Sequence, residues 1–389
     1  MRNKKNILMP LRYIYPACVI AFVCITLVAT GGCNGGSGDS ATGGTGTLSV
    51  GLTDATTDQY KAIYVTIDEV QVHKGGDEQG GFVVVGRPDA TYNLLALVNG
   101  MIQQLALADL EADEYTQMRL ILGDEPDGGD NILGSPHDFP NYLIDQTDAI
   151  HELKVPSGFQ SGIKLVRTFT IYTGRTTELL LDFDASKSVV VAGSSGNYNL
   201  KPTIKVIDLG NSSTLMGTVT DDQTRPLEGV HISAQTYDPS TEDVKDEVLV
   251  VATTITDENG EYKIYIESGA YNLVAYKDSF SPSCRNVNLE SANYTEDFIL
   301  SESLTGTVSG SINLDSQEVA LSFRRTAQCE GAVENQKIEV KSINAISSYQ
   351  GDILPVGAYE LVASTEGYDA QVYDMEVLES VQTIQDIEF

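Results

Sequence analysis

The sequence has no tryptophan, few histidines and few basic residues. Its 389 residues include 4 His and 24 Lys or Arg, against 55 Asp or Glu, so the formal net charge is −31. A nucleic-acid-binding protein needs a basic surface, so this class of function is excluded, as is electrostatic docking on anionic lipid head groups. The lack of tryptophan weakens a role in sugar binding on aromatic platforms, although stacking on some of the 19 tyrosines stays open.

Motifs of the common catalytic and metal centres are missing as well. There is no H-E-x-x-H zinc motif, G-x-S-x-G elbow, P-loop, dinucleotide fingerprint or Cys/His cluster. The S-x-x-K match at residues 161–164 lacks its usual S-D-N and K-T-G partners. We therefore predict a protein that is not an enzyme. An enzyme with an unfamiliar site in residues 47–209 is the alternative.

The N-terminal apolar run, residues 17–29, is shorter than the about 20 residues that a membrane-spanning helix needs. Basic residues precede it, and small residues lead from it to Cys33. This order predicts a signal peptide over residues 1–32. The segment Val28-Ala29-Thr30-Gly31-Gly32-Cys33 resembles a bacterial lipobox, with Thr30 where that family usually has Leu. The resemblance implies cleavage before Cys33 and acylation of this residue, and two or three acyl chains would anchor the protein firmly.

The residues around Cys33 suggest where the protein is held. Asn34 stands where many Gram-negative lipoproteins retained at the inner membrane have Asp, so the outer membrane of the cell envelope is favoured. Residues 33–46 are rich in Gly and Ser and predict a flexible tether. An ordinary secretory signal with an incidental Cys, or an uncleaved anchor, is the alternative. After cleavage the net charge would be −35, because the signal segment carries four positive charges and no negative one.

Two further cysteines, Cys284 and Cys329, remain in the mature chain. In an oxidising compartment they could form one disulfide, which would clamp two predicted domains together. Two free thiols are the alternative.

An internal repeat organises the C-terminal half. The segment 215–219, L-M-G-T-V, returns 89 residues later as L-T-G-T-V at 304–308. The segment 269–275, G-A-Y-N-L-V-A, returns 88 residues later as G-A-Y-E-L-V-A at 357–363. We therefore predict two copies of one module, 213–300 and 303–389. Alternating strands and the Asn259-Gly260 turn predict small antiparallel β-sandwiches, with a hairpin at that turn.

The first copy resembles the carboxypeptidase-regulatory-like, transthyretin-like domain. The residues that carry the resemblance include Gly217, Pro226, Asp257 and Tyr271. The second copy keeps G-A-Y at 357–359 but lacks the T-D-x-x-G turn, so it is a diverged relative. Such domains are accessory β-sandwiches, so the fold implies no function.

Residues 47–209 predict a third, different β domain. The apolar phase changes within the strand 62–73, which predicts a β-bulge near residues 68–69. Asn99-Gly100 at the centre of 94–107 predicts a hairpin, with a helix as the alternative. The other predicted strands, forming an antiparallel set, are 47–52, 115–122, 163–172, 178–183, 189–192 and 200–207.

Several segments of this domain resemble the bacterial lipoprotein family called domain of unknown function 4382. Asp113-Glu114 departs from that pattern, where a Gly usually precedes the Tyr. The family has no assigned activity, so the resemblance implies none. The matching segments are 46–50, 52–55, 65–70, 115–120, 154–158, 161–165 and 181–184.

Calcium is the one cofactor that the residue pattern suits, because hard cations bind several carboxylate and carbonyl oxygens. The acidic, Gly-rich segment 124–131 offers Asp124, Asp127 and Asp130 but fails the EF-hand spacing. Asp182 and Asp184 lie two apart in a strand and hence on one face. Asp54 and Asp68 could converge with them. Solvated or locally hydrogen-bonded Asp side chains are the favoured interpretation of both groups.

Together these patterns predict an all-β protein with three tandem antiparallel β-sandwiches after a signal peptide and a tether. We expect a non-enzymatic lipoprotein, held in the membrane by its lipid, that displays these modules for binding or adhesion to a protein, a polysaccharide or a surface assembly. A spacer stiffened by calcium is the alternative.

Overall fold

The computed structural model describes residues 44–389 except 56, 58, 77–80, 156–161, 193–196 and 315–316. In this part of the chain five β-sheets and a few short helical turns account for the regular structure, so the prediction of an all-β fold is confirmed. None of the described helices is long and apolar enough to cross a membrane. The predicted signal peptide and Cys33 lie outside the described residues.

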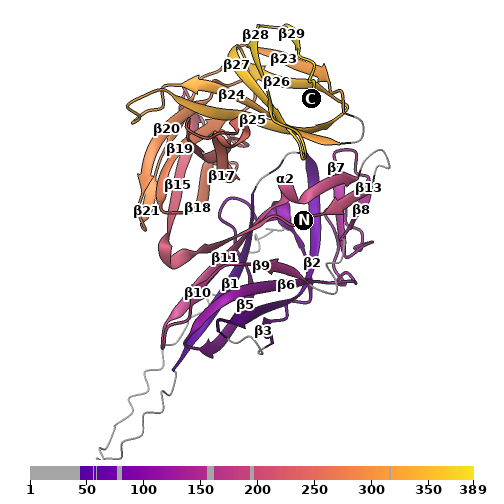
Figure 1. Cartoon of the computed structure of the whole chain (residues 1–389), viewed down its shortest axis with the longest axis vertical. Helices are drawn as coiled ribbons and strands as arrows, with labels where there is room; N and C mark the ends of the chain where they lie inside the picture. The colour runs from indigo at the N-terminus through magenta and orange to yellow at the C-terminus, as the bar shows by residue number, and fades with distance from the viewer. Residues whose placement is uncertain are drawn as a thin grey trace, which may run out of the picture. The chain divides into compact units, whose positions relative to one another are not determined.

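The N-terminal body, residues 45–208, consists of two sheets (Figure 1). The smaller sheet has the strand order β14-β11-β1-β5, and the larger has the order β10-β6-β2-β7-β8-β13-β12, with β3 and β4 on β2 and β9 on β6. The strands are β1 (Thr45–Ala55), β2 (Tyr60–Lys74), β3 (Val83–Gly86), β4 (Ala90–Asn93), β5 (Gln103–Glu111), β6 (Glu114–Leu122), β7 (Asn141–Asp145), β8 (Ile150–Lys154), β9 (Ile163–Leu165), β10 (Phe169–Thr170), β11 (Thr176–Asp184), β12 (Val189–Ala192), β13 (Asn197–Leu200) and β14 (Ile204–Asp208).

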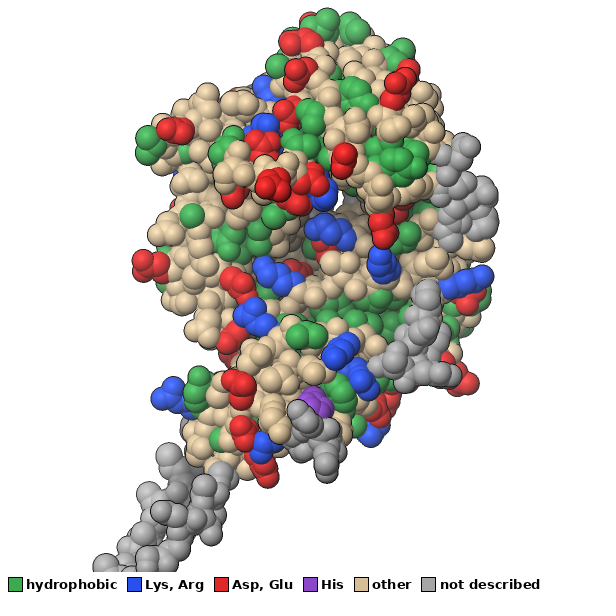
Figure 2. Space-filling view, viewed as in Figure 1, with side chains coloured by type: hydrophobic (Ala, Val, Ile, Leu, Met, Phe, Trp, Pro, Cys, Tyr) green, Lys and Arg blue, Asp and Glu red, His purple; other side chains and the backbone are tan. Residues whose placement is uncertain are grey.

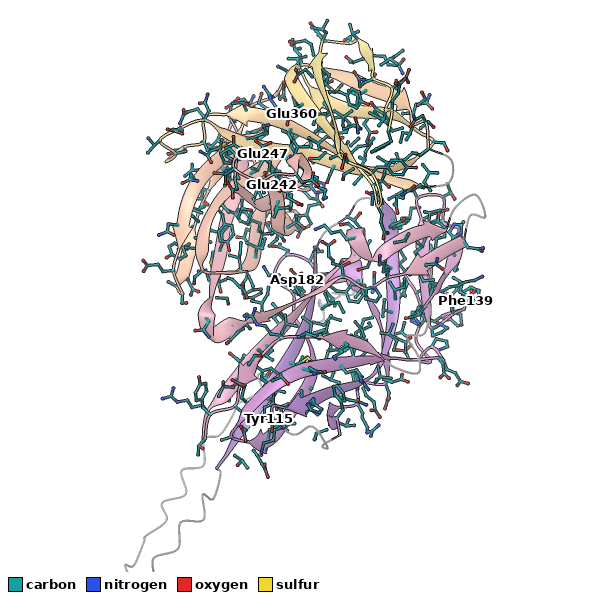
Figure 3. All side chains as sticks on the ribbon, viewed as in Figure 1. Tyr115, Phe139, Asp182, Glu242, Glu247 and Glu360 are labelled. Atoms are coloured by element: carbon teal, nitrogen blue, oxygen red, sulfur yellow. A yellow bond between two sulfur atoms is a disulfide. The ribbon has the colours of Figure 1, made fainter. Side chains whose placement is uncertain are left out.

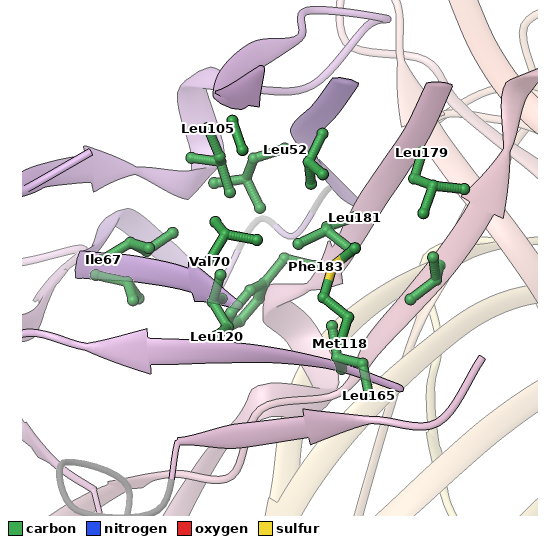
Figure 4. Close-up of a cluster of buried hydrophobic side chains, with 14 of the residues drawn as sticks. Leu52, Ile67, Val70, Leu105, Met118, Leu120, Leu165, Leu179, Leu181 and Phe183 are labelled. Carbon is green, nitrogen blue, oxygen red and sulfur yellow. The ribbon is translucent and has the colours of Figure 1, made fainter. Parts of the chain in front are cut away.

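One hydrophobic core joins the two sheets of this body (Figure 4). Leu52 and Leu181 enter it from the smaller sheet, and Ile67, Val70 and Leu120 enter from the larger one. The register of β2 against β6 shifts between Ile67 and Glu69, so the predicted bulge is confirmed. Because of this shift, Ile67 before it and Val70 after it both face the core, whereas Tyr64 packs in a separate cluster.

Several expectations for this body are wrong, beginning with strand direction and strand bounds. The set is not purely antiparallel, because β1 and β11 pair in parallel from Thr47↔Thr176 to Ala55↔Asp184. Such a pair needs a long crossover connection, which the alternation of one strand does not reveal. The predicted strand 200–207 is split into β13 and β14 around Pro202, which has no N–H to give to a ladder. The predicted strand 163–172 is also split, into β9 and β10.

The predicted hairpin at Asn99-Gly100 is wrong, although the turn exists. Both residues have positive φ, 57° and 72°. The flanking segments pair with different sheets, because β4 pairs with β2 and β5 pairs with β1, and a short 3-10 helix, η1 (Leu94–Ala96), lies between them. The Asn99 side chain instead accepts from the backbone N–H of Lys263 at 2.6 Å and donates to the carbonyl of Glu261 at 3.1 Å. The turn therefore connects the N-terminal body to the next part of the chain.

Residues 212–300, the first module, and residues 305–389, the second module, share one topology (Figure 1). The first has sheets β18-β15-β21, with β22 on β15, and β17-β16-β19-β20; the second has β26-β23-β29 and β25-β24-β27-β28, linked through Ile346↔Ser348. The strands are β15 (Ser212–Asp221), β16 (His231–Tyr237), β17 (Val248–Ile255), β18 (Glu261–Glu267), β19 (Gly269–Tyr276), β20 (Ser283–Leu289), β21 (Asn293–Thr295), β22 (Phe298–Leu300), β23 (Thr305–Ser311), β24 (Glu318–Ala327), β25 (Gln336–Ile346), β26 (Ser348–Pro355), β27 (Gly357–Ser364), β28 (Gln371–Val377) and β29 (Gln382–Ile384).

A glycine packed closely against a backbone carbonyl marks equivalent positions of the two modules. Gly217 lies opposite Tyr262, whose hydroxyl donates to the carbonyl of Glu296 at 2.6 Å. Gly310 lies opposite Tyr349 in the same way, and the Tyr349 hydroxyl donates to the carbonyl of Gln385, directly after β29, at 2.7 Å. A Cβ would lie 2.0 Å from that carbonyl oxygen at Gly217 and 1.9 Å at Gly310.

The structure therefore corrects one of the two sequence matches that define the repeat. Gly217 corresponds to Gly310, four residues beyond the Gly306 that the G-T-V string suggested, and a shift of four keeps the same face of the strand. The other sequence match is confirmed, because Tyr271 and Tyr359 each donate a hydroxyl hydrogen bond to the carbonyl four residues earlier.

The predicted hairpin at Asn259-Gly260 is also wrong. β17 pairs with β16 in one sheet, and β18 pairs with β15 in the other. Asp257 stabilises the turn by accepting from the N–H groups of Asn259 and Glu261, both at 2.9 Å. Both flanking runs bury an apolar face in the same core, and they do so from opposite sheets, so the turn crosses between the sheets.

Candidate functional site

The acidic segment 124–131 forms a loop held by its own hydrogen bonds. Asp127 accepts from the backbone N–H groups of Thr91 and Gly129, both at 2.9 Å. Burial opposes these bonds, but together they hold the pKa of Asp127 below its ordinary value. Asp124 and Asp130 lie exposed on the same loop. Asp127 is therefore engaged in stabilising the loop.

His137 and Tyr142, which the sequence analysis did not single out, contact this loop. The Nδ1 of His137 lies 2.7 Å from the Tyr142 hydroxyl, and its Nε2 lies 3.5 Å from the Asp127 carboxylate. The Tyr142 side chain is fully buried. The three side chains hold the loop against β7, which gives His137 a structural role.

Asp182 and Asp184 share one face of β11, as predicted from their spacing, and Asp54 lies close enough for their charges to add to the rise in its pKa that burial causes. The register places Asp182 opposite Thr53 and Asp184 opposite Ala55, whereas Asp54 lies opposite Phe183, which is buried in the core. Asp54 accepts from the backbone N–H of Ala185 at 3.0 Å, and its burial raises its pKa well above the ordinary value.

The two carboxylates on that face have different environments. Asp184 caps the short helix α2 (Ala185–Ser188), accepts from the Ser186 hydroxyl at 2.6 Å and pairs with Lys187 at 2.8 Å. Burial, and after it the charge of Asp184, raises the pKa of Asp182 to about 6. Asp182 is therefore the carboxylate on this face whose pKa is raised by burial and by the neighbouring charge of Asp184.

The candidate calcium residues form two separate groups, Asp124, Asp127 and Asp130 on the loop and Asp182 and Asp184 on β11. Asp68 lies apart from Asp182, and burial followed by the charges of Asp89 and Asp124 raises its pKa. Over the described ranges, no three His, Cys, Asp or Glu side chains gather in a group that could hold a metal ion. Calcium binding stays a prediction.

Cys284 and Cys329 form a disulfide that joins the two modules. Beside it, the backbone N–H of Asn286 donates to the carbonyl of Glu330 at 2.7 Å, and the N–H of Glu330 donates to the carbonyl of Cys284 at 3.0 Å. Val274 and Tyr276 of the first module pack in the core of the second. The bond thus lies beside an extended contact.

Polar side chains lock the same contact. Gln235 exchanges two hydrogen bonds with the backbone of Glu339, at 2.7 and 2.8 Å. Arg324, only 2% exposed, donates to the carbonyls of Val244 and Lys245 at 2.7 and 2.9 Å. Lys337 lies between Glu247 and Glu360, whose positions Figure 3 marks, at 2.8 and 2.9 Å. Polar residues that alternate with apolar ones along these strands could have been recognised in the sequence as outward-facing. The sequence does not show which residues they contact.

A cleft of about 610 Å³ lies next to this contact. One wall is the outer face of β16 and β17, a second is the outer face of β24 and β25, and the end of β11 with α2 forms a third. Figure 2 shows a hollow on this face of the molecule with Lys and Arg side chains at its edge. Small polar residues line it from both modules: Ser233, Thr253, Ser322, Ser342, Asn344 and Ser364.

The cleft contains the predicted residues Asp182 and Asp184 together with several charged residues that the sequence did not single out. Lys277 donates to the carbonyl of Glu228 at 2.6 Å, and Lys341 lies 3.7 Å from Asp278. Lys and Arg supply five of the lining residues, and Asp and Glu supply four. The arrangement can hold a hydrophilic ligand through hydroxyl, amide and charged groups.

Two family models match the chain. Residues 45–202 match the domain of unknown function DUF4382, and residues 214–301 match the carboxypeptidase regulatory-like domain. The two domain-family resemblances stated from the sequence are confirmed, and neither description names a catalytic activity. No curated protein matches the chain.

Likenesses to solved structures are weak. The Bacillus anthracis TIE protein is 13% identical, with 88% of this chain and 50% of that chain covered and a TM-score of 0.20. The streptococcal ancillary pilin is 10% identical, with 88% and 99% covered and a TM-score of 0.19. The 3-chlorocatechol 1,2-dioxygenase of Rhodococcus opacus 1CP is 13% identical, with 24% and 60% covered and a TM-score of 0.19. The chain spans about half the length of the first of these proteins, and such scores carry no argument about function.

Proposed function

We propose that this chain, a DUF4382 domain followed by a carboxypeptidase regulatory-like domain and a related module, is a non-enzymatic bacterial lipoprotein. Cys33 would carry the lipid that holds it in the cell envelope, with the outer membrane favoured. The β modules would be displayed for binding or adhesion to a protein, a polysaccharide or a surface assembly.

The locked contact between the modules is the observation that supports this proposal best. A disulfide, the exchanged hydrogen bonds of Gln235 and the buried Arg324 all cross it. A displayed binding protein benefits from modules that keep a fixed relation, because a preorganised surface loses less entropy on binding. The disulfide also suits an oxidising compartment outside the cytoplasm.

The anchor is tested by replacing Cys33 with Ser. We expect the wild-type protein to enter the detergent phase of a Triton X-114 extract and C33S to lose its lipid and leave that phase. Cys24, nine positions earlier in the apolar run, supplies a matched control, C24S, which should behave as the wild type. Equal partition of C33S and the wild type would refute anchoring through this residue.

The binding role is tested by proximity labelling on intact cells, with the labelling enzyme fused after Phe389. We expect the same envelope or extracellular partner to be labelled across growth conditions. A fusion that replaces residues 45–389 by an unrelated folded domain behind the same anchor is the control for neighbours labelled by location alone. If both fusions label the same set, the modules are not binding elements.

A further inference from the structure

The cleft between the modules exists because the facing sheets carry small side chains. Packed sheets lie about 10 Å apart when large apolar residues fill the space between them. Here the outer face of β16 presents Ser233, and the outer face of β24 presents Ala320 and Ser322. These side chains are too short to fill the gap, and about 610 Å³ stays open. This volume lies within the range of sites that hold small ligands.

The charge of the cleft departs from that of the whole chain. Its lining has five basic residues against four acidic ones, whereas the whole sequence has 24 against 55. The lining residues are therefore nearly balanced in a strongly acidic protein. A cleft walled by protein focuses the electric field of the charges that line it. The charge of the lining therefore affects a bound ligand more than the charge of the distant surface does.

Two of the basic residues are suited to contact a ligand. The ammonium of Lys277 donates to a neutral carbonyl oxygen, that of Glu228, so that bond leaves its charge uncompensated. Lys341 lies at 3.7 Å from Asp278 and 3.6 Å from Asp352, distances too long for hydrogen bonds. In contrast, Arg324 already donates to backbone carbonyls and serves the contact between the modules.

We propose that this cleft binds an acidic oligosaccharide, with Lys277 and Lys341 contacting its carboxylates. The proposal deepens the binding function above and rests on it. Hydroxyl and amide side chains on both walls offer donors and acceptors to sugar hydroxyls. Aliphatic residues of β17, among them Leu249 and Val251, offer apolar contact to the C–H faces of the rings.

The test is calorimetric titration of the mature chain with a carboxylated tetrasaccharide, tetragalacturonate, and with a neutral one, cellotetraose. We expect the acidic sugar to bind, with an affinity that falls as salt is added, and the neutral sugar to bind at least about tenfold more weakly. Equal binding of the two sugars, or no binding of the acidic one, would overturn the proposal. A tetraglutamate peptide that binds as well as the sugar would also overturn it, because charge alone would then explain binding.

Variants locate the site. K277Q and K341Q should each weaken binding of tetragalacturonate about tenfold. K61Q is the matched control, because Lys61 pairs with Asp148 in the N-terminal body and is absent from the cleft lining, and it should bind as the wild type. A320W should block the cleft sterically while keeping every charge. Unchanged melting curves would establish that these variants fold, and wild-type affinity in all of them would place the sugar elsewhere.

Failure of this inference is distinguishable from failure of the proposed function. If no sugar binds while proximity labelling still recovers a partner through residues 45–389, the cleft proposal is wrong and the display function stands. If K277Q and K341Q also abolish labelling of that partner in cells, the cleft is the binding site but for a different ligand, and the assignment of an acidic sugar is overturned.

Discussion

The two C-terminal modules have the same strand order but keep different parts of the sequence. The first carries the T-D-x-x-G turn at Asp257–Gly260, and the second lacks it. In both modules a glycine packs against a backbone carbonyl of a neighbouring segment, and a tyrosine hydroxyl donates a hydrogen bond to that carbonyl. Both modules therefore retain glycine at the point where two backbone segments come closest, because only a residue without a Cβ fits there. Turn residues are more easily replaced.

The largest expected effect tests how far the modules are independent. The double variant C284S/C329S removes a cross-link that spans 45 residues, and we expect a loss of roughly 4 kcal/mol in the free energy of unfolding. Urea unfolding followed by circular dichroism should then resolve separate steps for the modules. The wild type in dithiothreitol is the control and should match the variant. A single, unshifted transition would indicate that the noncovalent contact alone couples the modules.

The next effect tests the equivalence of the glycines. G217A and G310A each place a Cβ at 2.0 or 1.9 Å from a carbonyl oxygen, so we expect each to cost about 3 kcal/mol of stability in urea unfolding. Gly128 has open space around it, and G128A should be close to neutral. A large loss at one of the two positions with none at the other would break the structural alignment of the modules.

Asp182 of the N-terminal body differs from Asp221 and Asp386 of the modules in the direction in which its surroundings shift its pKa. In the modules, hydrogen bonds from Arg225 hold the pKa of Asp221 below its ordinary value, and those from Ser311 do the same for Asp386. In the N-terminal body, burial raises the pKa of Asp182 to about 6. The stabilising contribution of Asp182 is complete below its ordinary pKa and is lost as the pH rises through about 6.

We therefore expect D182N to gain roughly 2 kcal/mol of stability at pH 7.5 and almost none at pH 4. Urea unfolding at the two pH values measures the difference. D184A, two residues along the same face, is the control: it removes the side-chain cap of α2 and should cost about 1 kcal/mol at pH 7.5. A pH dependence unchanged in D182N would contradict this assignment.

A smaller effect sharpens the comparison of the tyrosines. Y262F and Y349F each remove a hydroxyl that donates to the carbonyl packed against Gly217 or Gly310, at 2.6 and 2.7 Å. We expect about 1 kcal/mol lost in each case, because a buried carbonyl loses its partner. Thermal melts that show the two losses equal within error would support the structural equivalence, and a clear inequality would show that one module relies on this contact more.

The smallest expected effect concerns calcium. The candidate residues form two separate groups, and Asp127 and Asp184 are engaged in local hydrogen bonds. We expect millimolar calcium to shift Tm by less than about 1 °C, because a cation that does not bind the folded state cannot stabilise it. EDTA-treated protein is the reference. A clear rise in Tm that D182N abolishes would support the alternative of a calcium-stiffened spacer.

Local patterns predicted much of this molecule. Alternation located most strands, and the change of phase in β2 located the bulge between Ile67 and Glu69. Two Asn-Gly turns were also found, but each was assigned to a hairpin and each crosses between sheets. A turn reverses the chain locally, whereas pairing depends on which core the flanking strands share, and that is a nonlocal property.

The amino-acid pattern alone established the all-β class, the two family resemblances and the acidic balance, because composition and periodicity are local properties of the chain; the anchor at Cys33 stays a prediction from the same pattern. The folded chain decided the parallel pair β1–β11, the four-residue shift between the modules, the Cys284–Cys329 bond and the cleft. Each of these depends on which residues far apart in sequence come into contact. Small side chains such as Ser233 and Ser322 line a cleft only because two sheets place them face to face.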